Sequence, residues 1–76
     1  MTFRELDTVV VAKDLPAHGL RRGDVGAVVQ VYSPTSIEVE FVTATGHTQV
    51  VVTLATDQVR PVGNRDLLAV RHLDAA

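Results

Sequence analysis

Three histidines and two closely spaced glutamates are the residues whose chemistry could serve acid–base catalysis or metal binding. His18, His47 and His72 lie far apart, and no two have the i, i+2 or i, i+4 spacing of a ready chelate. Zinc needs three or four convergent ligands, so we expect no metal site. Glu38 and Glu40 would share one face of a strand, about 7 Å apart, a spacing that suits acid–base work in a cleft. On an exposed strand, the same pair keeps the sheet solvated and discourages edge association.

The chain contains no sequence motif for nucleophilic catalysis or for phosphate binding. Serine occurs only at Ser33 and Ser36, and neither stands in a Ser–His–acid arrangement. The segment Gly19–Gly26 (GLRRGDVG) is rich in glycine, but no Gly-Lys-Ser/Thr follows it and no helix is expected after it. We therefore predict a protein that is not an enzyme, with no cofactor and no small-molecule substrate.

Length and composition indicate one small domain. The 76 residues are few for a stable core, so a partner subunit is one means of support. The chain has no cysteine, a net charge of −2 and no apolar run long enough to span a membrane. The first residues lack the apolar region of a signal peptide. We expect a single domain over residues 1–76, with a core at about 6–62 and an extension at 63–76, acting in the cytoplasm without a membrane.

Valine-rich segments with a period of two predict an all-β fold. Valine is stiff at its first side-chain torsion and suits a pleated sheet. The expected strands are Thr8–Lys13, Asp24–Tyr32, Ile37–Val42, His47–Leu54 and Val59–Val62, with one tight helical turn at Ala55–Gln58. The segment Asp66–Leu73 fits either a short helix or an edge strand, and its alternation favours the strand.

Alternation along each strand also predicts which side chains fill the core. On the third strand, Ile37, Val39 and Phe41 are expected to face inward. The second strand is assigned an inner set of Val25, Ala27, Val29 and Val31 and an outer set of Val28, Gln30 and Tyr32. Gly23 and Gly26 would allow a bend or a positive φ at the start of that strand.

The strings GDVG at 23–26, EVEF at 38–41 and GHT at 46–48, together with DTV at 7–9 and KDLP at 13–16, resemble a small bacterial family of unknown function, numbered 4926. The resemblance covers about three quarters of the chain, up to Val62. Ile37 departs from the family pattern, which has tyrosine before EVEF. The resemblance implies a small SH3-like five-stranded barrel and no established activity. The GDxG turn is also similar to that of KOW-type and nitrile-hydratase β-type barrels, which concerns backbone geometry only.

Valines predicted on the outer faces suggest an interaction surface. Several on neighbouring strands would form a contiguous apolar patch, which commonly marks an interface. Leucines of the C-terminal extension could cover this patch instead, and the sequence leaves both explanations open. The predicted contact residues are Val10, Val28, Val42 and Val51, with Tyr32 and Arg60 at the rim because both types are favoured at binding hot spots. We therefore expect a non-catalytic protein-interaction module, as a homodimer or as the partner or neutralising half of a two-gene bacterial pair.

Two alternatives follow from other features. Lys13, Arg21, Arg22 and Arg60 would form a small basic patch if they meet at one end of the barrel, as in a KOW-like nucleic-acid-binding module. The mild negative charge and the scarcity of aromatic residues count against that function. The second alternative is an accessory domain or subunit of a larger enzyme.

Overall fold

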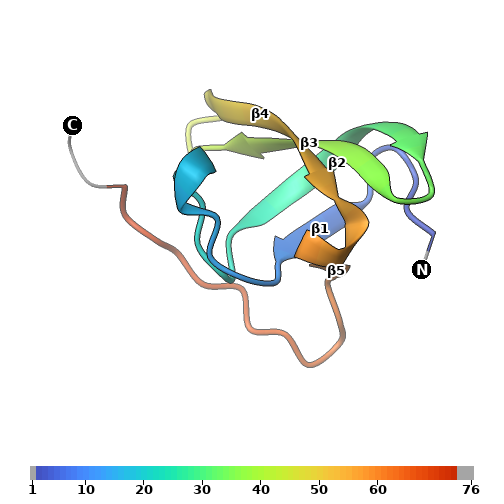
Figure 1. The fold of residues 1–76 in the computed structure, drawn as a ribbon. Coiled ribbons are helices and arrows are strands. Elements are labelled where there is room, and N and C mark those ends of the chain that lie inside the picture. The colour runs from blue at the N-terminus through green and yellow to red at the C-terminus, as the bar shows by residue number, and fades with distance from the viewer. Residues whose placement is uncertain (1, 74–76) are drawn as a thin grey trace.

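The computed structural model describes residues 2–73 and shows five antiparallel strands in one curled sheet (Figure 1). The strands are β1 (Thr8–Val11), β2 (Val25–Ser33), β3 (Ser36–Val42), β4 (Thr48–Ala55) and β5 (Val59–Pro61). Two 3-10 turns, η1 (Pro16–His18) and η2 (Thr56–Gln58), lie in the β1–β2 loop and between β4 and β5. The all-β prediction is confirmed, and all five expected strands are present.

The strand order is β4-β3-β2-β1-β5, so the first strand bridges the β2–β3–β4 meander and the short last strand. Strands β4 and β5 occupy the two edges, and the sheet is not closed by pairing between them. This arrangement is compatible with a small SH3-like fold. The sequence predicted a barrel, whereas the sheet in the structure is not closed. No helix among residues 2–73 is long and apolar enough to cross a membrane.

The curled sheet encloses one apolar core drawn from every strand. Its largest fully buried side chains are Ile37, Leu54, Val9, Val11, Val28 and Val39. Phe3, from the N-terminal segment, and Leu15 and Leu20, from the β1–β2 loop, also belong to this cluster. The long loop therefore contributes to the core, because Leu15 and Leu20 form an isolated bridge that folds it back on itself.

Strand β1 is buried on both faces, which corrects the prediction for Val10. Val9 and Val11 belong to the core cluster, whereas Val10 is buried outside it. On its own face, Val10 lies between its cross-strand partners Val25 on β2 and Arg60 on β5. Neighbouring side chains on both sides thus shield Val10, and it cannot serve as an exposed contact residue.

The inner and outer faces of β2 are reversed relative to the prediction in its first half. Val28 is fully buried and lies opposite Val39. Val25, Val29 and Val31, which are all predicted to lie on the inner face, are exposed. The register shifts between Val28 and Gln30, so Val29 is an extra residue in the strand. A β-bulge of this kind changes which face later residues occupy. Strict alternation over the whole strand therefore could not hold, and Val28 is a core residue rather than an interface residue.

Gly26 fixes the inner face of β2 because it permits close approach to β3. A Cβ at Gly26 would lie 2.7 Å from Val39 Cγ1, 2.8 Å from Phe41 Cε1 and 2.9 Å from the Glu40 carbonyl oxygen. The glycine is thus required for packing, whereas Gly23, with a φ of +95°, is required for the turn that precedes β2.

The C-terminal extension is neither strand nor helix over residues 62–73, so the predicted strand at Asp66–Leu73 is wrong. The tail runs below the sheet in Figure 1. Leu67 is 91% exposed and Val70 is 100% exposed, so these side chains do not cover an apolar patch. Residues 74–76 of the predicted extension lie outside the described residues.

Substitution of Gly26 by alanine tests the close approach of β2 and β3. We expect Gly26→Ala to lower the free energy of unfolding by about 1–3 kcal/mol, because the new methyl group meets backbone as well as side chains. Gly63→Ala is the control, since a Cβ at Gly63 meets only Asp66 Oδ2, at 3.4 Å. Urea denaturation followed by circular dichroism measures both. Equal stability of the two variants would contradict the packing argument.

Candidate functional site

Two of the predicted contact residues, Val42 and Val51, lie exposed on the outer face of β3 and β4. Val42 is 54% exposed and Val51 is 46% exposed. Val51 lies opposite Glu40, and Val42 lies opposite Thr48. The two valines therefore lie diagonally on the outer face, in neighbouring rows, and each has a polar residue opposite it.

Hydrogen bonds within the sheet hold the two glutamates of this face. Thr48 Oγ1 donates to Glu40 Oε2 at 2.6 Å, and the Tyr32 hydroxyl donates to Glu38 Oε2 at 2.9 Å. The hydrogen bond to the Glu38 carboxylate raises the pKa of Tyr32 above its ordinary value. Both carboxylates thus serve as acceptors for neighbouring hydroxyl groups, which orders the polar part of the surface around the valines.

The side of β4 that faces away from β3 is an open sheet edge. Strand β4 ends the strand order, so no described strand pairs with this side. Its eight residues, TQVVVTLA, include no charge and no proline. One register shift, between Phe41 and Val42 on β3, affects the beginning of β4 only, and Val50–Ala55 pair in continuous register. The edge is therefore regular over six residues.

Backbone alternation identifies the groups that this edge presents. The N–H of Thr56, the first residue after β4, donates to the carbonyl oxygen of Thr35, the residue before β3, at 3.1 Å. In an antiparallel pair, every second residue exchanges hydrogen bonds with the same neighbour. Leu54 and Val52 consequently bond to β3, whereas Val51 and Thr53 direct their N–H and C=O groups toward the open side.

The other sheet edge is much less accessible to a partner strand. Strand β5 contains only three residues, and one of them is Pro61, which has no N–H to donate. Its central residue, Arg60, binds Asp66 of the tail through two hydrogen bonds of 2.8 Å. Hydrogen bonds from Arg60 and from the Gly63 N–H lower the pKa of Asp66 to about 2. The tail is thus anchored immediately after β5.

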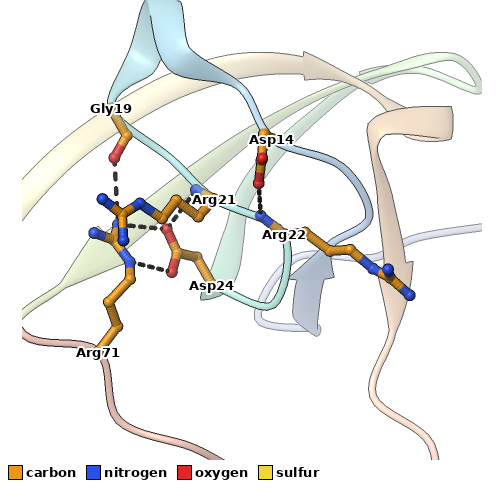
Figure 2. Close-up of polar contacts among 6 residues, drawn as sticks. All are labelled: Asp14, Gly19, Arg21, Arg22, Asp24 and Arg71. Carbon is orange, nitrogen blue, oxygen red and sulfur yellow. Dashed lines mark hydrogen bonds and ion pairs between the residues drawn. The ribbon is translucent and has the colours of Figure 1, made fainter.

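A second ion pair fastens the far end of the tail to the β1–β2 loop (Figure 2). Arg71 donates from Nε to Asp24 Oδ1 at 2.9 Å and from Nη2 to Asp24 Oδ2 at 2.7 Å. Arg71 Nη2 also donates to the Gly19 carbonyl at 3.3 Å, and the Arg21 N–H donates to Asp24 Oδ2 at 2.8 Å. Partial burial works to raise the pKa of Asp24, but the bonds from Arg71 and Arg21 lower it overall.

The predicted basic patch is divided by these contacts. Figure 2 shows the Arg22 side chain extending away from the Asp24–Arg71 pair, while the Arg21 side chain lies beside Arg71. The Arg22 N–H binds Asp14 Oδ1 at 2.9 Å, which places a carboxylate at the base of the same loop. Arg60 is engaged by Asp66, and Lys13 is exposed. The geometry therefore does not favour a continuous cationic surface for nucleic acid.

Of the six predicted interaction residues, three lie on the outer face of the β2–β3–β4 sheet: Tyr32, Val42 and Val51. Val10 and Val28 are buried, and Arg60 is held at the opposite edge. Sequence reasoning missed the open edge of β4. The sequence of Thr48–Ala55 contains no charged residue and no proline, and this composition could have indicated an unprotected edge.

The three histidines are exposed, and residues 2–73 contain no group of three or more metal-ligating side chains.

The comparison with known families matches most of the chain. The chain belongs to the family described as "Domain of unknown function (DUF4926)", which matches residues 5–61. The family predicted from the sequence motifs is confirmed, and the matched segment ends with β5, before the tail. Neither a curated protein nor a solved structure matches the chain.

The Asp24–Arg71 contact makes a pH-dependent prediction. Asp24→Asn retains an oxygen that can accept from the Arg21 N–H but removes the charge that binds Arg71. We expect a loss of about 1 kcal/mol in the free energy of unfolding at pH 7. Because the folded pKa of Asp24 is lowered, this stabilisation is complete above the unfolded value near pH 4 and is lost as pH falls through the folded pKa.

Urea titrations of wild type and Asp24→Asn between about pH 7 and pH 3 measure this difference. The gap in stability should stay constant down to about pH 5 and narrow below about pH 4. Asp57→Asn, at an exposed position of η2, is the control for loss of one carboxylate. A gap of unchanged size at pH 3 would show that the effect of Asp24→Asn is not ionic.

Proposed function

We propose that this protein is a non-catalytic module that binds a protein partner by strand addition along the open side of β4. The observation that carries the proposal is an eight-residue edge strand without charge or proline. Folded proteins commonly protect such an edge with lysine, proline, a bulge or a covering segment. An unprotected edge offers N–H and C=O groups in a row, and an extended partner segment can satisfy them.

Side chains next to the edge support selective binding. Backbone hydrogen bonds supply sequence-independent affinity in strand addition, whereas pockets and neighbouring side chains select the partner. Val51 lies on the edge strand itself, Val42 lies on the adjacent strand, and Tyr32 lies on the same outer face. An incoming strand with apolar side chains on this face would shield Val51 from water, and tyrosine is favoured at binding hot spots.

We infer further that the partner is encoded by a neighbouring gene, with this chain as the partner or neutralising half of a two-gene pair. A bound edge strand occupies backbone groups of the partner, which is a direct physical means of holding that partner inactive. A partner enzyme that is active in the complex would instead make this chain an accessory subunit. Co-expression of the two genes, with activity measured in the presence and absence of this chain, separates the two roles.

Two substitutions at the β4 edge test the binding surface. Thr53→Pro removes an N–H that faces the open side, so the β3–β4 ladder keeps its hydrogen bonds while the edge loses a donor. Val51→Lys places a cation opposite Glu40, which favours the folded chain and adds a charge where a partner strand would pair. We expect each variant to reduce partner capture from a native lysate at least about tenfold, which corresponds to about 1.4 kcal/mol.

The control for these variants is Leu67→Lys. It introduces the same charge at an exposed residue of the tail, which Figure 1 shows on the side of the molecule away from β4. Quantitative mass spectrometry of proteins captured by tagged wild type and by each variant gives the readout. Capture of one protein by wild type and Leu67→Lys, with loss in both β4 variants, supports the proposal. Absence of any enriched protein, or equal capture by all four chains, would refute it.

A further inference from the structure

We propose that the β4 edge pairs with β4 of a second copy of this chain, in an antiparallel arrangement centred on Val51. This inference rests on the proposed function, since it uses the same edge, and it names a second copy of the chain as the occupant of that edge when no other partner is bound. A dimer with two-fold symmetry uses the same surface patch on both subunits, and this patch must complement itself. The residues of β4 and the backbone groups they present meet that requirement.

The backbone groups of Val51 and Thr53 fit a two-fold axis. Both residues direct N–H and C=O away from β3 by the alternation of the β3–β4 ladder. With Val51 of one copy opposite Val51 of the other, each can donate its N–H to the carbonyl of its counterpart. The same register sets Thr53 opposite Gln49 of the second copy. Thr53 lies in the regular part of β4, whereas Gln49 lies at the register shift, so the regular pairing is centred on the two Val51 residues.

The side chains of β4 complement themselves in this register. Val50 and Val52 flank Val51, so pairing about Val51 places Val50 of one copy opposite Val52 of the other. Directly opposed like charges destabilise an antiparallel pair. Val51 lies on the two-fold axis and faces its own copy, so a lysine or glutamate at this position would face a like charge and be repulsive. Thr48–Ala55 carries no charged residue, and the pairing avoids this penalty.

The nearest carboxylates are far enough apart to be screened. Glu40 lies one strand inward from Val51, so the two copies of Glu40 are separated by three strand spacings. At about 4.8 Å for each spacing, this distance is about 14 Å. The Debye length at physiological salt is about 8 Å. Repulsion between the Glu40 side chains therefore opposes the pairing only weakly.

Self-association should be directed to β4 rather than to β5. The β5 edge offers three residues with Pro61 among them, and Arg60 is bound to Asp66. Association through β4 alone joins two sheets at one edge and leaves a β5 edge at each end. Growth into longer assemblies is thereby limited, and a dimer is the expected product.

Cysteine cross-linking tests the register, because the chain has no cysteine of its own. A hydrogen-bonded antiparallel pair has a Cα separation near 5.5 Å, within the range of about 4.4–6.8 Å that disulfides accept. We expect V51C to form a disulfide-linked dimer under mild oxidation at least about ten times faster than T53C. The two copies of residue 53 would lie about 13 Å apart along the strands in this register.

Light scattering after size exclusion provides the second measurement. Wild type and Leu67→Lys should shift from monomer to dimer between about 10 μM and about 1 mM, whereas Val51→Lys should stay monomeric. Circular dichroism establishes that each variant is folded. A wild-type chain that is monomeric throughout, together with equal cross-linking of V51C and T53C, would overturn the homodimer. Capture of a different protein in a β4-dependent manner would then leave the proposed function standing, and absence of such capture would end both.

Discussion

The close approach of β2 to β3 at Gly26 is the constraint on which the arrangement of this sheet depends. Val39 and Phe41 fill the space that a side chain at residue 26 would need. Gly26 therefore marks the inner face of β2, and Val28, two residues later, follows it into the core. The bulge at Val29 then lets the strand bend around that core. In the resulting sheet β1 lies between β2 and β5, and β4 and β5 form the edges.

The two edges differ in a way that connects the fold to binding. Strand β5 is short, contains Pro61 and is followed directly by a tail held through Asp66 and Arg71. Strand β4 is longer and has none of these protections over its regular part. A small chain with a limited core gains stability when a partner covers such an edge. Exposed Val51, on the edge strand itself, would lose contact with water in the same event.

Sequence patterns predicted the strands and the β3 core well, because both depend on local alternation. Ile37, Val39 and Phe41 are buried as expected, since β3 keeps an undisturbed period of two within its own residues. The faces of β2 were wrong because a bulge and a close approach are properties of two strands together. Burial of Val10 likewise depends on Val25 and Arg60, which pairing brings to either side of it.

The candidate site was predictable only in part. The exposure of Val42 and Val51 followed from alternation along β3 and β4, because each valine is next in sequence to a residue that faces the core. The absence of charge in β4 could be seen in the sequence, but its position at an edge required the strand order. The pairing of Asp24 with Arg71 spans 47 residues, and no local pattern indicates it. Long-range contacts of this kind decide which surfaces the tail occupies and which stay open.

Amide hydrogen exchange along β4 tests the central claim most directly, because adjacent residues serve as internal controls. In the dilute monomer, the N–H groups of Val52 and Leu54 should exchange slowly and those of Val51 and Thr53 quickly. On association with a second copy or another partner, Val51 and Thr53 should become protected while Val52 and Leu54 change little. Exchange at Val51 and Thr53 that stays fast in the associated state would contradict binding through the edge of β4.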